Sequence, residues 1–173
     1  MHARTTSGGI LKLSKIGTSL LILAAAMLQA AGAGASEKAH GGDIEAIEKA
    51  FTAWATGTGG PYDLLADDVV WTITGRSLAS KTYRGREAFL NEVIHPFNAR
   101  MSTGLKPTIR NIYSDGDTVI VFFDASGVAR DGKPYANTYA WFLKMRDGNI
   151  VEANAFFDSI AFNDLWTRVQ PES

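Results

Sequence analysis

The sequence predicts an α+β fold in which a curved antiparallel sheet carries helices on one face and the two layers enclose a cone-shaped pocket. Segments with helical spacing of apolar residues lie in the first half of the domain. Segments rich in β-branched and aromatic residues fill the second half, separated by three short connectors that each contain an Asp-Gly pair. Such connectors are typical of hairpins, so the last four strands are predicted to be antiparallel.

The helical half begins at Asp43, which is a suitable amino-terminal cap for the apolar spacing from Ile44 to Trp54. Glycines and a proline in 57–61 end this helix. A later helix contains Pro96, which is expected to kink it or end it early. The predicted segments after the first helix are a helical turn over 62–66, a strand over 69–74, a polar loop over 75–84 and a helix over 85–101.

The strand half consists of segments without helical periodicity. The residues between the hairpin connectors alternate or run apolar, as strands with one or two buried faces do. The predicted strands cover 105–113, 118–130, 135–146 and 150–162, and a short terminal segment follows over 163–169. Because helices precede strands, the helices are expected to pack against one face of the sheet.

The first 35 residues have the layout of a secretory signal peptide. Basic residues without any acidic residue precede an apolar run over 16–28, and small residues suit cleavage after Ala33 or Ala35. The alternative is an uncleaved membrane anchor, since 16–35 is nearly long enough to span a bilayer. We therefore expect a periplasmic or secreted protein without membrane contact after cleavage, with a flexible leader over 36–42 and one domain over 43–169.

Charge and composition exclude several classes of function. Cleavage after residue 35 would remove three of the 17 basic residues and none of the 18 acidic ones, changing the formal charge from −1 to −4. No basic stripe is present, so nucleic acid is not an expected partner. The chain has no cysteine, and only His40 and His95 remain after cleavage. Neither a metal site nor any cofactor is expected, although His95 is a candidate pocket base.

Several short phrases resemble the nuclear-transport-factor-2-like superfamily, including its SnoaL-like and ketosteroid-isomerase-like branches. They are LLADDV at 64–69, GREAF at 85–89, YAWF at 139–142, GNI at 148–150 and FFD at 156–158. The resemblance spans 43–165 and implies the cone-shaped fold described above. It also implies a homodimer, because relatives commonly pair through the exposed face of the sheet. It does not imply one activity, since isomerases, cyclases, hydrolases and binding domains share the fold.

At the catalytic positions, the sequence departs from the ketosteroid isomerases but matches the SnoaL-like cyclases. An ungapped match places the proton-shuttling aspartate of ketosteroid isomerases on Ile73, and their first-helix tyrosine has only Trp54 nearby. Ketosteroid isomerase chemistry is therefore not expected. In SnoaL-like cyclases the acid/base aspartate lies near the end of the last strand, where this chain has Asp158. Asp158 is accordingly the first candidate for an acid/base residue.

The alternation of side chains along the predicted strands indicates candidate residues for a site. Asp158 shares a face with Asn154, Phe156 and Ile160, and apolar surroundings would raise its pKa; alternatively it caps a turn or pairs with an arginine such as Arg110. Asp124 is either a second pocket acid or part of a salt bridge between strands. Tyr139 could donate a hydrogen bond to a substrate oxygen with Asn137 orienting it, or be a core aromatic. The predicted binding residues are Trp54, Tyr62, Trp71, Phe97, Met101, Asp124, Trp141 and Phe156.

These residues support two main hypotheses about function. In the first, the domain is a cofactor-independent acid/base enzyme that acts on a small hydrophobic molecule, with Asp158, Tyr139 and Asn137 as catalytic residues. In the second, the same cone binds a small hydrophobic ligand without changing it. A third possibility is a purely structural role, in which the pocket is filled by the protein's own side chains.

Overall fold

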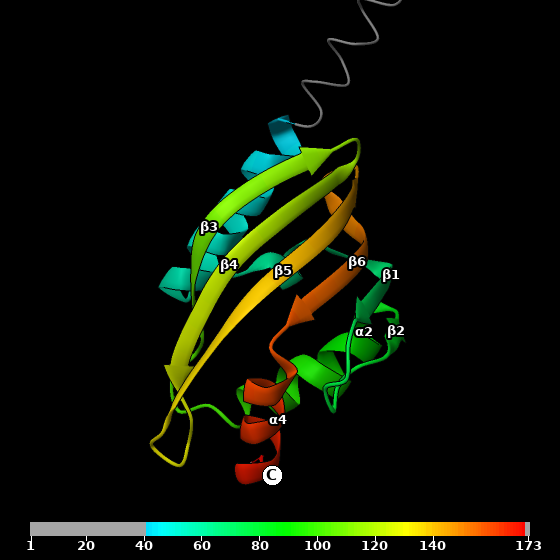
Figure 1. Cartoon of the computed structure of the whole chain (residues 1–173). Coiled ribbons are helices and arrows are strands. Elements are labelled where there is room, and N and C mark those ends of the chain that lie inside the picture. Colours follow the sequence, from blue (N-terminus) through cyan, green and yellow to red (C-terminus); the bar gives the residue numbers. More distant parts are fainter. Residues whose placement is uncertain (1–40, 172–173) are drawn as a thin grey trace, which may run out of the picture. The chain divides into compact units, whose positions relative to one another are not determined.

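The computed structural model describes residues 41–171, in which six strands form one sheet in the order β2-β1-β6-β5-β4-β3 (Figure 1). Neighbouring strands are antiparallel except β1 and β6, which are parallel. The α+β prediction is confirmed, with one parallel pairing added to the predicted antiparallel sheet. The strands are β1 (Leu65–Ile73), β2 (Thr82–Arg84), β3 (Lys106–Asp115), β4 (Thr118–Val128), β5 (Pro134–Arg146) and β6 (Asn149–Phe157).

Helical segments accompany the sheet at both ends of the described chain. The first helix is described over 41–56 and lies against one face of the long strands, whereas α4 lies beyond the end of β6 (Figure 1). Among residues 41–171 no helix is long and apolar enough to cross a membrane. The predicted signal peptide lies outside this range. The other helical segments are η1 (Pro61–Leu64), α2 (Arg86–Phe89), η2 (Leu90–Ile94), α3 (His95–Asn98) and α4 (Ser159–Arg168).

Of the two outcomes predicted for Pro96, a kink or an early end of the helix, the early end is not observed. The segments α2, η2 and α3 follow one another without interruption, and η2 is a π-helical turn in which the N–H of His95 donates to the carbonyl oxygen of Leu90. In a regular helix, a proline ring clashes with the carbonyl group one turn earlier, and the proline has no N–H to donate. A π turn is wider, so the helix accommodates the ring and the missing hydrogen bond. The chain therefore stays helical as far as Asn98.

Three other boundaries differ from the sequence prediction. β1 begins at Leu65 and not at residue 69, and the predicted loop contains the short strand β2. The last strand ends at Phe157, five residues earlier than predicted. The reason is Asp158, whose carboxylate accepts the N–H of Ile160 at 2.8 Å and so caps α4. Helix capping thus overrides the strand propensity of the residues that follow.

The hairpin signals correctly predicted the turns between the last strands. In the β5–β6 connection Asp147 and Gly148 have φ angles of 52° and 75°, so both lie in the left-handed region. Two such residues in succession match the backbone twist of paired antiparallel strands, and glycine adopts this conformation without steric cost. The turn fixes the register in which Tyr139 lies opposite Phe157.

The core lies between the first helix and the inner face of the sheet. Ile47 and Phe51 of the helix are fully buried, and the Phe51 ring lies 4.8 Å from that of Phe123 on β4. Every second residue of β5 from Tyr135 to Met145 is buried, which confirms the predicted alternation. The inner face of β5 therefore carries the side chains available to a pocket.

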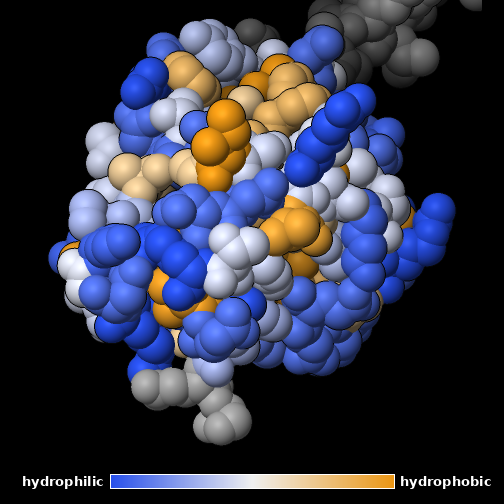
Figure 2. Space-filling view, turned by 60° about the horizontal axis from the view of Figure 1, so that its bottom comes forward, coloured by the Kyte–Doolittle hydropathy of each residue, from blue (hydrophilic) through white to orange (hydrophobic). Residues whose placement is uncertain are grey.

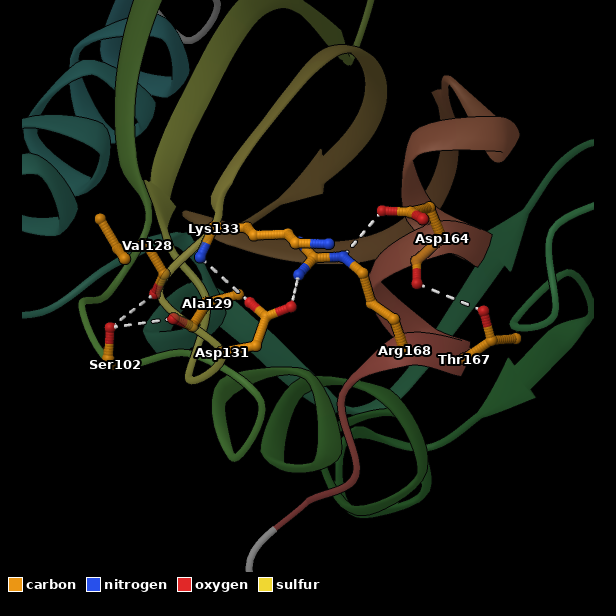
Figure 3. Close-up of polar contacts among 8 residues, drawn as sticks. All are labelled: Ser102, Val128, Ala129, Asp131, Lys133, Asp164, Thr167 and Arg168. Carbon is orange, nitrogen blue, oxygen red and sulfur yellow. Dashed lines mark hydrogen bonds and ion pairs between the residues drawn. The ribbon is translucent and has the colours of Figure 1, made fainter.

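Polar contacts hold α4 against the turn between β4 and β5 (Figure 3). Arg168 lies between two carboxylates: it forms an ion pair with Asp131 of the turn, and its Nε is 2.8 Å from Asp164 Oδ2 on its own helix. The Ser102 hydroxyl donates to the carbonyl oxygens of Val128 and Ala129, at 3.0 and 3.3 Å. The ion pair between Arg168 and Asp131 joins α4 to the turn, and Phe162 of α4 lines the cavity described below.

Candidate functional site

An internal cavity of about 300 Å³ lies between the helical segments and the inner face of the sheet. Its wall is mainly aromatic and aliphatic, and its few polar side chains are two tyrosines, one aspartate and one asparagine. It is lined by Trp54, Gly59, Gly60, Tyr62, Asp63, Trp71, Ile73, Phe89, Val93, Ile94, Phe97, Asn98, Leu105, Tyr139, Trp141, Ala155, Phe157 and Phe162. A concave, mostly apolar site with a few convergent polar groups is typical of small-molecule binding.

Aromatic rings form much of the cavity wall. Trp54 and Trp141 are stacked with their centroids 5.9 Å apart, and Trp71 is stacked on Phe89 at 4.4 Å. Trp71 meets Trp141 edge to face at 5.1 Å, so the two stacks form a continuous cluster. The Nε1–H of Trp71 is a buried donor for which residues 41–171 provide no acceptor. The rigid rings shape a slot that suits a flat hydrophobic molecule.

A hydrogen-bonded chain of side chains leads from Asn137 to Tyr139. The Asn137 Nδ2 donates to the Tyr135 hydroxyl at 3.0 Å, and the hydroxyls of Tyr135 and Tyr139 are 3.0 Å apart. Tyr135 and Asn137 are buried, with 3% and 6% of their surfaces exposed. Of the three residues, Tyr139 lines the cavity, and no sequence pattern predicted the contribution of Tyr135.

The backbone around Asp158 determines the orientation of the Asn137 amide. Its Oδ1 accepts the N–H groups of Asp158 and Thr138, at 2.9 and 2.8 Å, and its Nδ2 also donates to the carbonyl oxygen of Asp158 at 3.0 Å. Because a backbone N–H can only donate, Oδ1 and Nδ2 cannot be exchanged. The amide therefore presents a donor, and not an acceptor, to Tyr135.

This orientation makes Tyr135 an acceptor from Asn137, and either tyrosine can donate to the other. The two hydroxyls share one hydrogen bond and have two protons, so one proton of the pair has no acceptor among residues 41–171 in either direction. Tyr139 lines the cavity and Tyr135 does not. A ligand acceptor in the cavity can therefore receive the Tyr139 proton while Tyr135 donates to Tyr139.

Both tyrosines of the cavity are neutral under ordinary conditions. Burial, followed by the proximity and hydrogen bond of Tyr135, raises the pKa of Tyr139 well above its usual value. Burial likewise raises the pKa of Tyr62. A phenol with a raised pKa keeps its proton, so each hydroxyl can donate a hydrogen bond to a ligand oxygen.

The structure places Asp158 outside this cavity. The residue is exposed, its carboxylate caps α4, and it does not line the cavity. The predicted apolar row of Asn154, Phe156 and Ile160 is not buried: Phe156 and Ile160 are 43% and 82% exposed. The inner row of β6 is instead formed by Ala153, Ala155 and Phe157. The structural alternatives predicted for Asp158 were to cap a turn or to pair with an arginine such as Arg110. Asp158 does act as a cap, but it caps helix α4, and Arg110 pairs with Asp124 instead.

Asp124 is on the outer face of the sheet, where it forms the salt bridge that was one of its two predicted roles. Its carboxylate contacts Arg110 Nε at 2.6 Å and accepts the Thr138 hydroxyl at 2.7 Å. The hydrogen bond from Thr138, followed by that from Arg110, lowers the pKa of Asp124. Asp124 is therefore not a second acid of the cavity.

The other predicted binding residues separate into two groups. Trp54, Tyr62, Trp71, Phe97 and Trp141 line the cavity as predicted. Met101 is buried in the core without lining the cavity, and Phe156 packs against Phe142 on the outer face, with ring centroids 5.8 Å apart. Figure 2 looks toward the lower end of Figure 1 and shows exposed hydrophobic side chains there as separate patches among hydrophilic ones.

Sequence reasoning missed several lining residues. Ile73 lies in the cavity wall, so the position that matched the isomerase aspartate does face the ligand site but carries an apolar side chain. Phe157 and Phe162 were missed because the last strand was predicted to continue to residue 162 and the row of Phe156 and Asp158 was assigned to its inner face. Asp63 and Asn98 line the cavity and are also exposed to solvent, so they form part of the cavity rim.

Among residues 41–171, neither a histidine nor a cluster of metal-binding side chains lines the cavity. His95 is exposed, pairs with Asn91 through Nδ1 at 3.1 Å and does not line the cavity. Residues 41–171 contain no group of three or more His, Asp or Glu side chains that could hold a metal ion. The chemistry that the cavity itself offers is hydrogen-bond donation from tyrosines and contact with aromatic rings.

An α+β cone with an aromatic internal cavity defines a fold class of small-molecule binding proteins and enzymes. The match of residues 41–153 to the SnoaL-like domain shows that the chain belongs to this family. No curated protein is similar enough in sequence to match.

Solved structures show the same fold. An NTF2-like protein of unknown function from Burkholderia pseudomallei has 16% identity and a TM-score of 0.61, covering 73% of this chain and 98% of that chain. A putative SnoaL-like polyketide cyclase from Jannaschia sp. has 16% identity and a TM-score of 0.58, with coverages of 72% and 93%. A putative isomerase from Bacillus subtilis has 17% identity and a TM-score of 0.59, with coverages of 75% and 99%. At these identities the likeness concerns the fold alone.

Proposed function

We propose that the domain binds a small, flat hydrophobic molecule that carries a hydrogen-bond acceptor, such as a carbonyl oxygen. The observation that carries this proposal is a cavity walled by three tryptophan rings and lined by a tyrosine hydroxyl that can donate to a ligand while it accepts from Tyr135. The volume of about 300 Å³ is at the lower end of the range of about 300–1,000 Å³ for small-molecule sites. It suits a compound of one or two rings.

Two contributions would hold such a ligand. Its rings would lose water against the tryptophans, at about 25 cal/mol per Å² of apolar surface. Its acceptor would receive the proton of Tyr139, for a net gain of about 1 kcal/mol, which corresponds to about a fivefold gain in affinity. The hydrogen bond therefore provides selectivity, whereas the aromatic wall provides most of the affinity.

The acid/base hypothesis for Asp158 stays a prediction. It is less well supported than binding, because the carboxylate is exposed and caps α4 while Tyr139 lies in the cavity. The exported location and the homodimer likewise stay predictions. If the domain does catalyse a reaction on its ligand, Asp158→Asn tests the assignment: turnover unchanged by this substitution would contradict it.

A matched pair of ligands tests the binding proposal. 1-Tetralone and tetralin have the same fused rings and differ only in the carbonyl group. Titration calorimetry should show tetralone binding about fivefold more tightly, and Tyr139→Phe should abolish this difference without weakening the binding of tetralin. Tyr113→Phe is the control, because Tyr113 is 55% exposed on β3 and does not line the cavity.

A second variant tests whether the cavity is the binding site. Ala155 is buried in the wall, so Ala155→Leu would fill part of the space with three additional carbon atoms. Both ligands should lose affinity in this variant while the protein remains folded by circular dichroism. Absence of binding by either ligand to the unaltered protein at millimolar concentration would contradict the proposal, as would binding that Ala155→Leu leaves unchanged.

A further inference from the structure

The rim of the cavity carries a carboxylate without a counter-ion. Asp63 belongs to η1, lines the cavity and is exposed. Its Oδ2 accepts the N–H of Gly60 at 2.8 Å, and within residues 41–171 the carboxylate forms no ion pair. The hydrogen bond holds the side chain at the rim and leaves Oδ1 available to solvent or to a ligand.

The other lining residues do not compensate this negative charge. Within residues 41–171, no lysine, arginine or histidine lines the cavity, and Asp63 is the one charged lining residue. The faces of the aromatic rings carry negative partial charge, which attracts cations and repels anions. Trp54, Tyr62 and Trp141 share the cavity wall with Asp63, so the electrostatic potential of the site favours a positive group near the rim.

We infer that the ligand carries a cationic amino group, which lies against Asp63 at the rim while its ring system lies among the tryptophans. This inference rests on the proposed function and narrows it from hydrophobic molecules in general to hydrophobic amines. Asp63 is a specificity-determining residue in this interpretation. Because its carboxylate is exposed, the gain is that of a surface ion pair, about three- to fivefold in affinity.

Three compounds of similar shape separate charge from ring binding. 2-Naphthylmethanol is neutral, 2-naphthylmethylamine is a cation at pH 7, and 2-naphthoate is an anion. Calorimetry at low salt should give the tightest binding for the amine, with the alcohol about three- to fivefold weaker and the naphthoate weaker still. Added salt should reduce the advantage of the amine, since an exposed ion pair is screened.

Variants of Asp63 assign the preference to this residue. In Asp63→Asn the side-chain oxygen can still accept the Gly60 N–H, so the turn is kept and only the charge is lost. The amine and the alcohol should then bind equally, with the affinity for the alcohol unchanged. Asp63→Glu should keep a preference for the amine. Asp67→Asn is the matched control, because Asp67 is also exposed but does not line the cavity.

The outcomes distinguish failure of this inference from failure of the proposed function. If the three compounds bind without a preference for the amine, or if Asp63→Asn preserves the preference, the inference is wrong while ring binding stands. If none of them binds, the proposed function is wrong and the inference falls with it. A preference for the amine that disappears in Asp63→Asn and persists in Asp67→Asn supports both.

Discussion

Replacing Asn137 with alanine should destabilise the domain far more than replacing a typical surface asparagine. The side chain is 6% exposed and makes three hydrogen bonds besides the one from the adjacent Thr138 N–H: one to the Tyr135 hydroxyl and two to the backbone of Asp158. Each bond contributes about 1 kcal/mol net, so the free energy of unfolding should fall by about 3 kcal/mol. The loss would free the junction between β6 and α4.

The same substitution at Asn154 is the control. Asn154 lies on β6 in the row that faces away from the cavity, and its side chain makes no hydrogen bond with the rest of residues 41–171, so Asn154→Ala should change stability by less than about 0.5 kcal/mol. Urea unfolding followed by tryptophan fluorescence measures both variants.

Asn137→Ala should have a second effect, which a merely structural residue would not produce. Without the amide, the Tyr135 hydroxyl loses the donor that holds it beside Tyr139, so the preference for tetralone over tetralin should weaken. A loss of stability below about 1 kcal/mol, or a loss equal to that of Asn154→Ala, would refute the reasoning. An unchanged preference for tetralone in a folded Asn137→Ala protein would refute the positioning role of Asn137.

Three further predictions concern stability and are checked by urea unfolding. Asp158→Ala should cost about 1 kcal/mol through loss of the α4 cap, whereas Asp158→Asn, also a good cap, should cost much less; equal costs would contradict capping. Gly127→Ala should cost about 1–3 kcal/mol, because its Cβ would lie 3.1 and 3.2 Å from two backbone oxygens, whereas Gly104→Ala meets nothing within 4 Å and should be tolerated. Hydrogen bonds from neighbouring side chains lower the pKa values of Asp124 and Asp131 below the ordinary 3.8. The two carboxylates therefore contribute fully to the free energy of unfolding above about pH 4, and this contribution is lost as the pH falls further. Asp124→Asn should make the free energy of unfolding less dependent on pH in this range.

The amino-acid sequence was sufficient to predict the fold class, the order of most elements and part of the cavity wall. Helical spacing identified the buried Phe51 and the lining Trp54, and the Asp-Gly signal identified the turn at Asp147, because both depend on neighbours within a few residues. The family phrases extended the prediction to the cone and its cavity, which explains why Tyr62 and Trp141 were correctly placed.

The face of β6 that lines the cavity could be assigned only from the folded structure. Side chains alternate between the two faces of a strand, so Asn154, Phe156 and Asp158 are predicted to share one face. Both faces of this strand carry aromatic residues, so hydrophobicity did not show which face is turned toward the cavity. The parallel pairing of β1 with β6 and the capping of α4 determined the outcome.

The polar part of the site also depends on the tertiary structure. The Tyr135 hydroxyl contacts the Asn137 amide and the Tyr139 hydroxyl of the same strand. The orientation of the Asn137 amide in turn depends on the backbone of Asp158, which follows the end of β6. Asp63 is adjacent to the cavity only because η1 folds over its rim. Hydrogen-bond direction and unpaired charge are properties of groups brought together across the chain, so no local pattern in the sequence contains them.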